Sequence, residues 1–362
     1  MSSKKDELET PLLMLEEEEG PMAPLLDQGS PEPTRRPRLP PPKFGELITV
    51  LSIDGSGMHG LIPTVVLKCL EEKLKAIDGE DARIADYFDV IAGMSAGSMI
   101  VTMLVSPNTN KRTKYTPQEI LDFYVNNGPN IFPSKRCWRW PLDLLSALRG
   151  PKYDGTYLQK KKIKEVTGER TLSKLTAPTF DANLLEPLIF TSFQDAVQKP
   201  VDEAGPDLPD VCIGPASTAT PTYFPANYFD IWVSDMEPAK YHLIDGGNNP
   251  TMAAISKIIR EQLLKNPEFQ PNGVNYMKYL VISAPFGEAI LAMDNATSKN
   301  MADLLDIGYK LLAEKAAMVY LTTGKYETVE DEDAPTNDAE LQRFSKLLVV
   351  ERNLRLKERQ RQ

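Results

Sequence analysis

The stretch that decides the fold is DYFDVIAGMSAGSMIVTMLVS, residues 86–106. Residues 87–92 read as a short buried strand, and residues 98–105 are apolar enough for a core helix. Between them stands Gly93-Met94-Ser95-Ala96-Gly97, the pattern G-x-S-x-G. A serine at the apex of a sharp strand-to-helix turn needs small residues two positions before and after it, because the backbones crowd there. The pattern therefore predicts that Ser95 is a nucleophile whose Oγ lies over the first N–H groups of a helix.

The composition is that of a globular protein with polar tails. The chain has 362 residues, and a hydrophobic content of 41% is enough for a substantial core. A net charge of −10 argues against nucleic-acid binding and against non-specific adhesion to anionic membranes, since both depend on excess Lys and Arg. No segment reads as a secretory signal or a transmembrane helix. We therefore expect a cytoplasmic protein, peripheral at membranes, whose lipid contacts are hydrophobic.

Cysteine usage points to a reducing compartment. The three cysteines, Cys69, Cys137 and Cys212, are far apart and have no partner at a metal-binding spacing. We therefore expect no disulfide framework, no metal and no cofactor.

Three regions are expected along the chain. Residues 1–43 are acidic and proline-rich, a composition that cannot bury enough apolar surface to fold, so we expect a disordered arm. Residues 46–295 form the expected catalytic domain. Residues 296–362 are expected to be helical, with an acidic loop over 327–340 and a basic tail. The cluster Trp138-Arg139-Trp140 suits insertion into a lipid interface, although burial is the simpler interpretation.

A glycine-rich loop precedes the serine turn. The apolar run at residues 47–53 leads into Asp54-Gly55-Ser56-Gly57-Met58-His59-Gly60, and a helix with one apolar face follows. The loop matches G-x-G-x-x-G, so a dinucleotide-binding site is an alternative, with Glu80 or Asp81 placed to bind a ribose. That alternative needs a second strand ending in an acidic residue, whereas the next strand here ends in the serine turn. We favour an oxyanion hole built from the backbone N–H groups of this loop.

The base that activates the serine is expected to be a carboxylate. The chain has two histidines, His59 and His242, and neither can complete a triad in the order Ser, Asp, His near the C-terminus. The best candidate is Asp245, which ends the apolar run Tyr241-His242-Leu243-Ile244 and precedes Gly246 and Gly247. An ordinary Asp-Gly turn is the alternative interpretation of this motif.

Taken together, the three ordered motifs resemble patatin, the plant lipid acyl hydrolase, and its patatin-like phospholipase relatives. The resemblance extends from about Val50 to Ala254. It implies an α/β protein with a three-layer α/β/α fold, a mostly parallel central sheet and a helical C-terminal part. It also implies a catalytic dyad of Ser95 and Asp245 without histidine. The implied oxyanion hole and motif glycines are Gly55, Ser56 and Gly57, then Gly60, Gly93, Gly97, Gly246 and Gly247.

The same resemblance implies a function. Relatives of this kind are serine esterases that cleave carboxylic ester bonds of membrane phospholipids and galactolipids through an acyl-enzyme, in lipid degradation and plant defence. The alternative is a patatin-like protein with weak or lost activity that binds or stores lipid.

Two departures from the family's usual loop lead to a further expectation. Ser56 stands where relatives usually have a third glycine, and His59 stands where they usually have an arginine. If position 56 requires a positive φ, a serine there costs on the order of 1 kcal/mol and tilts the N–H groups of the loop. Slower turnover than in a relative with the usual loop is then expected. The chain is also short after Gly247, which leaves the geometry of the dyad less defined.

Overall fold

The computed structural model describes residues 48–106, 108, 113–133, 150–167, 175–182, 186–191, 217–231, 239–246, 251, 292–320, 325–328 and 334–361. The expected arm, the cluster at Trp138, Cys137, Cys212 and Gly247 lie outside these residues.

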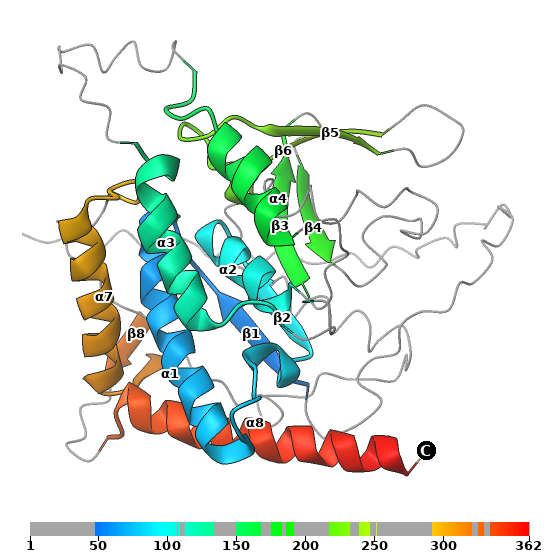
Figure 1. Cartoon of the computed structure of the whole chain (residues 1–362), viewed down its shortest axis with the longest axis vertical. Helices are drawn as coiled ribbons and strands as arrows, with labels where there is room; N and C mark the ends of the chain where they lie inside the picture. The colour runs from blue at the N-terminus through cyan, green and yellow to red at the C-terminus, as the bar shows by residue number, and fades with distance from the viewer. Residues whose placement is uncertain are drawn as a thin grey trace, which may run out of the picture. The chain divides into compact units, whose positions relative to one another are not determined.

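Six described strands form one sheet (Figure 1). They are β1 (Val50–Ile53), β2 (Val90–Gly93), β3 (Leu175–Asp181), β4 (Glu186–Thr191), β5 (Asn227–Ile231) and β6 (Ala239–Asp245). The order is β1-β2-β3-β6-β5, and β4 also pairs with β3. The pairs β1–β2 and β2–β3 are parallel, whereas the three pairs made by β4, β5 and β6 are antiparallel.

The described sheet is therefore mixed, and the prediction of a mostly parallel sheet holds only for β1, β2 and β3. The reason lies in the connections. Four residues join β3 to β4 and seven join β5 to β6, whereas a parallel pair needs a crossover of roughly a dozen residues or more.

Strand β3 brings two distant parts of the chain end to end. One side of β3 pairs along its length with β4. The other side is shared, with Ala92 of β2 opposite Thr176 and Asp245 of β6 opposite Thr179. Because β2 runs parallel to β3 and β6 runs antiparallel to it, the carboxyl ends of β2 and β6 point toward each other. They are separated by about three residues of β3, at about 3.3 Å per residue.

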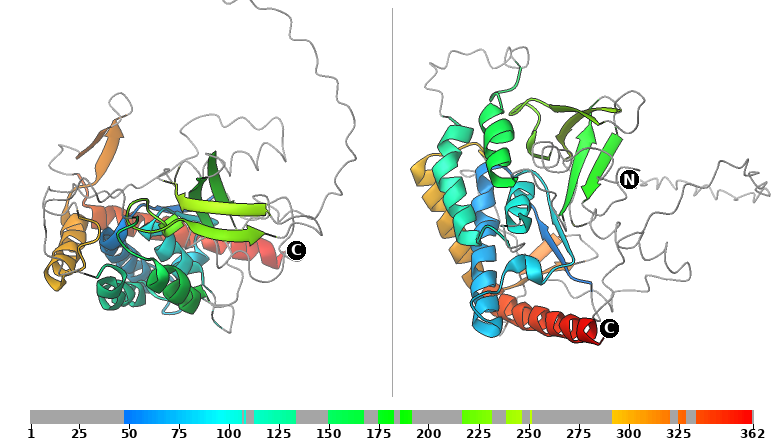
Figure 2. Two further views of the ribbon diagram at one scale, coloured as in Figure 1. Left: turned by 90° about the horizontal axis from the view of Figure 1, so that it is seen from above. Right: turned by 45° about the vertical axis from the view of Figure 1, so that its right-hand side comes forward.

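The main helices are α1 (Leu61–Asp78), α2 (Ala96–Val105), α3 (Pro117–Ile131), α7 (Ser298–Ala313) and α8 (Asn337–Gln360). Helix α1 contacts α3, α7 and α8, and Figures 1 and 2 show these neighbours around it. Short helical segments also occur at η1 (Gly57–Gly60), η2 (Ile84–Asp86), the π-helix η4 (Thr156–Lys162) and α4 (Ile163–Thr167). Helix α2 is buried at every position, as its apolar sequence predicts.

The C-terminal region contains the helices α7 and α8, and the predicted acidic loop is partly wrong. Lys325–Thr328 forms β8, which pairs with β7 (Ala317–Tyr320). The side chain of Thr336 accepts a hydrogen bond from the N–H of Ala339, so helix α8 begins at Asn337, inside the predicted loop.

Helix α8 is fastened to the start of the strands that carry the site. Arg355 makes a two-pronged contact with Asp89, with both N–O distances 2.8 Å. Asp89 also accepts a hydrogen bond from the N–H of Thr49 at 2.8 Å. The side chains of Arg355 and Asp89 are only 11% and 14% exposed. Because Asp89 comes directly before β2, this contact fixes the strand that leads to Ser95.

Candidate active site

Ser95 has the backbone of a sharp turn between β2 and α2. Its φ is 51° and its ψ is −121°, and the first residue of α2 follows directly. A positive φ is costly for a residue with a side chain, at about 1–3 kcal/mol. Such strain persists only where the surroundings impose it, and it is a recurrent property of functional sites.

The glycines on either side of Ser95 impose this turn. A Cβ atom at Gly93 would lie 2.4 Å from the carbonyl oxygen of Gly97, and one at Gly97 would lie 2.0 Å from the carbonyl oxygen of Ile53. Neither distance is possible for real atoms, so both positions require glycine. The crowding predicted from G-x-S-x-G is therefore present.

The glycine-rich loop packs against the same turn. A Cβ atom at Gly55 would lie 3.1 Å from the backbone nitrogen of Gly97. The far end of the loop is fixed by the N–H of Met58, which donates to the carbonyl of Met293 at 2.7 Å. The loop and the start of α2 thus form neighbouring backbone surfaces, which is the arrangement that two walls of an oxyanion hole require.

The prediction that Ser56 is strained is wrong. Ser56 is extended, with φ −133° and ψ 120°, a conformation open to any residue. The position that does require glycine is Gly57, whose φ is +49° and whose Cβ would lie 2.1 Å from the carbonyl oxygen of Met293. The chain has a glycine there, so the loop carries no penalty from Ser56, and the expected loss of turnover has no basis at this residue.

Backbone N–H groups close to Ser95 are available to bind an oxyanion. Within the described part of the chain, the N–H groups of Ser56, Gly57 and Ala96 make no hydrogen bond. Ala96 begins α2, so its N–H lies at the positive end of the helix dipole. Asp54 stands at the start of the loop. Much of the residue is exposed to solvent, but the protein partly desolvates its carboxyl and thereby raises its pKa.

Position 60 requires glycine because of the side chain that packs against it. A Cβ atom at Gly60 would lie 2.7 Å from the hydroxyl of Tyr124 in α3. That hydroxyl donates to the carbonyl of Ala96 at 2.9 Å, and burial raises the pKa of Tyr124, which keeps its proton in place. The last glycine of the loop therefore admits the side chain that fixes the start of α2.

Asp245 approaches from the opposite side, at the end of β6. Its N–H donates to the carbonyl of Ala219 at 3.0 Å, and Gly246 follows it. Its Oδ2 accepts a hydrogen bond of 3.0 Å from Thr220 Oγ1. Thr220 Oγ1 in turn lies 3.4 Å from Ser95 Oγ. The structure thus brings Ser95 and Asp245 to one place, with the hydroxyl of Thr220 between them.

Thr220 was not anticipated from the sequence. Its signal is weak: it ends Ser217-Thr218-Ala219-Thr220, a run of small and hydroxyl-bearing residues before Pro221. Ser217, Thr218 and Ala219 are buried, at no more than 6% exposed. Hydroxyl side chains buried close to an acidic candidate are the pattern that could have identified this segment.

A strained turn follows Thr220. Thr222 has a φ of 70°, which is rare for a β-branched residue. Its carbonyl accepts a hydrogen bond of 2.8 Å from the N–H of Lys152, and the carbonyl of Tyr223 accepts one of 2.8 Å from the N–H of Tyr153. These two bonds connect the segment that carries Thr220 to the residues just before η4.

His242 does not take part in this arrangement. Side chains alternate along a strand, so His242 and Asp245 project to opposite faces of β6. The ring of His242 packs instead against Tyr228 of β5, with ring centroids 4.1 Å apart. The position of His242 agrees with a carboxylate as the base.

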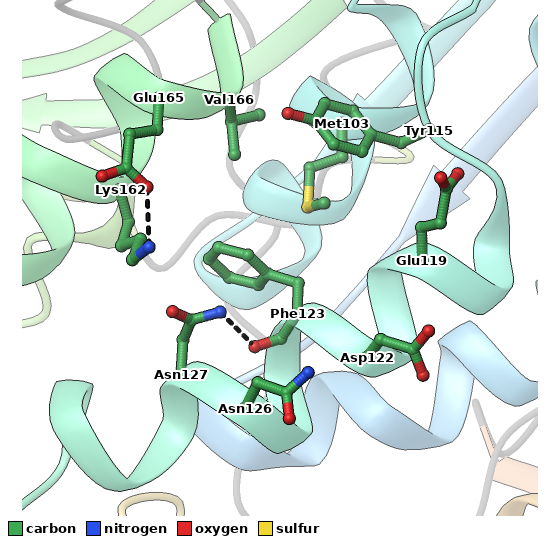
Figure 3. Close-up of a pocket in the computed structure, with 10 residues that line it drawn as sticks. All are labelled: Met103, Tyr115, Glu119, Asp122, Phe123, Asn126, Asn127, Lys162, Glu165 and Val166. Carbon is green, nitrogen blue, oxygen red and sulfur yellow. Dashed lines mark hydrogen bonds and ion pairs between the residues drawn. The ribbon is translucent and has the colours of Figure 1, made fainter.

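The cavity drawn in Figure 3 is lined by residues other than those of this site. It has a volume of about 320 Å³ and is lined from α2, α3, η4 and α4 by residues that include Met103, Phe123 and Lys162. Neither Ser95 nor Asp245 lines it. Among the described residues, no group of three or more His, Cys, Asp or Glu side chains could hold a metal ion.

Comparison with known proteins identifies the family. A sequence model described as patatin-like phospholipase matches residues 51–255, more than half of the chain. This chain belongs to the patatin-like phospholipase family. Patatin-like protein 1 of Arabidopsis thaliana is 32% identical over 391 residues, which span 87% of this chain and 93% of that relative.

Two further relatives extend the comparison. Patatin-like protein 2 of Arabidopsis thaliana is 41% identical over 257 residues, or 69% of this chain and 62% of that relative. Patatin-17 of Solanum cardiophyllum is 34% identical over 293 residues, or 77% of this chain and 72% of that relative. Membership of the patatin-like family supports lipid acyl hydrolase activity in general. The dinucleotide-binding alternative needed an acidic residue at the end of β2, which instead ends at Gly93.

A membrane span requires a helix that is both long and apolar. None of the described helices meets these two requirements.

Proposed function

We propose that this protein is a serine acyl hydrolase that cleaves carboxylic esters of phospholipids and galactolipids through an acyl-enzyme on Ser95. One observation carries the proposal: the strained turn at Ser95 lies between unbonded backbone N–H groups and a chain of hydrogen bonds that ends at Asp245. A nucleophile, an anion site and a base are the three parts that acyl transfer requires. The family supplies the class of substrate.

Each part has an assigned role. Ser95 Oγ attacks the carbonyl carbon of the ester, and Asp245 acts as the general base that accepts the proton. The N–H groups of Gly55, Ser56 and Gly57 stabilise the oxyanion together with that of Ala96, and one such donor lowers the barrier by about 2.7–4 kcal/mol. Water then attacks the acyl-enzyme, and the same groups act in reverse. The three-layer α/β/α arrangement and a setting in plant defence remain predictions.

The test is labelling with a fluorophosphonate, which reacts with an activated serine. We expect a single labelled residue, Ser95, and a fall in ester hydrolysis of roughly 10⁴–10⁶ in Ser95→Ala, the range for removal of a nucleophile that acts with its base as a unit. Ser106→Ala is the matched control, because Ser106 is a buried serine at the other end of α2. Undiminished hydrolysis in Ser95→Ala contradicts the proposal.

The lipid surface is predicted to be neutral. With a net charge of −10, the protein is repelled by anionic vesicles, and salt screens this repulsion over about 10 Å at 0.1 M. Hydrolysis should be faster on galactolipid or zwitterionic vesicles than on anionic ones, and the gap should shrink as salt is added. Equal rates on both surfaces at low salt would contradict this preference.

A further inference from the structure

The two hydrogen bonds of Thr220 have a fixed direction. Thr220 Oγ1 lies 3.0 Å from Asp245 Oδ2 and 3.4 Å from Ser95 Oγ. A hydroxyl has one proton to donate, and an ionised carboxylate can only accept. Thr220 therefore donates to Asp245, and Ser95 must be the donor in its contact with Thr220. The protons are aligned in one direction, from the nucleophile to the acid.

These two hydrogen bonds connect Ser95 to Asp245 through the hydroxyl of Thr220. The hydroxyl of Ser95 makes its hydrogen bond to Thr220, and no direct bond from Ser95 to Asp245 occurs among the described residues. The 3.4 Å contact is long, but catalytic hydrogen bonds are often long before substrate binds and shorten in the complex. A carboxylate that reaches the serine through a second hydroxyl differs from a simple dyad in the number of protons that move.

The backbone fixes Thr220 against Asp245. The N–H of Asp245 donates to the carbonyl of Ala219, the residue before Thr220. The carbonyl of Thr220 accepts hydrogen bonds from the N–H groups of Tyr223 at 3.1 Å and Phe224 at 2.9 Å. Threonine is also stiff at χ1 because it is β-branched. The hydroxyl is therefore preorganised, which a relay needs in order to work without a cost at each turnover.

We propose that Thr220 relays the proton from Ser95 to Asp245 during acylation, an inference that rests on the proposed function. The O–H bond of Ser95 breaks and its proton passes to Thr220 Oγ1, while the original proton of Thr220 passes to Asp245 Oδ2. The freed electron pair of Ser95 Oγ forms the bond to the acyl carbon, whose carbonyl electrons move onto its oxygen. When the tetrahedral intermediate collapses, the bond to the leaving alkoxide breaks, Thr220 Oγ1 donates its proton to that oxygen, and protonated Asp245 returns a proton to Thr220.

The experiment compares four single variants and one double variant of the full chain. Thr220→Val removes the hydroxyl and keeps the shape, Thr220→Ser keeps the hydroxyl, and Asp245→Asn removes the base. Thr102→Val is the matched control, because Thr102 is fully buried in α2 and its hydroxyl has no hydrogen-bond partner among the described residues. The readouts are the rate of fluorophosphonate labelling at Ser95 and kcat/KM for a soluble ester.

The relay predicts that Thr220→Val slows both reactions by about 10²–10⁴, the usual contribution of a positioned base. Thr220→Ser and Thr102→Val should remain close to wild type. The double variant Thr220→Val with Asp245→Asn should be no slower than Asp245→Asn alone, because both changes interrupt one path.

The outcomes separate the two proposals. If wild type is labelled and Thr220→Val matches it, Asp245 acts directly and the relay is overturned while the proposed function stands. If wild type is neither labelled nor active on esters, the proposed function is overturned and the relay with it.

A second measurement covers the case in which Thr220→Val does not fold. Acylation of wild type is measured in mixtures of H₂O and D₂O. Two protons in motion give a curved dependence on the fraction of deuterium, whereas direct transfer to Asp245 moves one proton and gives a straight line. A straight line overturns the relay.

Discussion

Ser95 and Thr222 are the two non-glycine residues with positive φ in the described part of the chain: Ser95 lies in the turn between β2 and α2, and Thr222 lies two residues after Thr220. The turn at Ser95 is imposed by atoms in contact, since Gly93, Gly97 and Ile53 leave no room for another backbone path. The turn at Thr222 is exposed and is fixed mainly by hydrogen bonds to Lys152 and Tyr153. The Ser95 side of the site is thus fixed by packing, and the side that carries Thr220 by a few hydrogen bonds.

This difference separates the two ways in which strain is maintained. Packing fixes a strained residue only if the whole core around it forms, so damage there should affect folding and catalysis together. Hydrogen bonds at a surface turn can be lost one at a time, so damage there should affect catalysis with little effect on folding. Three predictions test this contrast.

The largest effect is expected for Gly97→Ala. The new Cβ would lie 2.0 Å from the carbonyl oxygen of Ile53, and backbone cannot yield as a flexible side chain can. We expect loss of ester hydrolysis together with loss of soluble folded protein or a marked fall in Tm, measured by thermal unfolding. Gly79→Ala is the control for backbone strain without a clash: its φ is +98°, and nothing lies within 4 Å of its Cβ. Normal activity in Gly97→Ala would show that packing does not impose the turn.

A smaller effect is expected for Arg355→Met. The change leaves Asp89 without its two-pronged partner at the start of β2, and breaking a largely buried ion pair costs roughly 3–5 kcal/mol. The free energy of unfolding should fall by an amount of that order in denaturant titrations. Lys299→Met is the control, because its pair with Asp303 is exposed, at 87% and 49%. If both variants lose the same stability, the contact between α8 and Asp89 does not stabilise the strand that leads to Ser95.

The smallest effect is expected at Thr222. Glycine adopts positive φ freely, so Thr222→Gly relieves strain of about 1–3 kcal/mol, partly offset by the greater freedom of glycine in the unfolded chain. Thr222→Ala keeps the strain. Thr222→Gly should therefore be the more stable of the two by about 1 kcal/mol in chemical unfolding. Equal stability would mean that the turn at Thr222 stores no strain.

The sequence by itself determined the sharp turn at Ser95, the glycine-rich loop beside it and the family. These features are local. The sharp turn at Ser95 requires glycine at positions 93 and 97 because neighbouring backbone atoms leave no room for a Cβ, and the five-residue pattern G-x-S-x-G predicts this requirement. Asp245 as a candidate came from the same kind of reading, because an apolar run that ends in Asp-Gly-Gly is a strand end.

The tertiary structure decided the rest. Ser95 is 125 residues from Thr220, and Thr220 is 25 residues from Asp245. They meet only because β2 and β6 share one side of β3 with their carboxyl ends opposed, a register that no local pattern encodes. The requirement for glycine at position 57 likewise depends on the carbonyl of Met293, which is far away in sequence. Sequence fixes conformation over a few residues through steric contact, whereas the meeting of Ser95, Thr220 and Asp245 depends on which strands the folded chain places side by side.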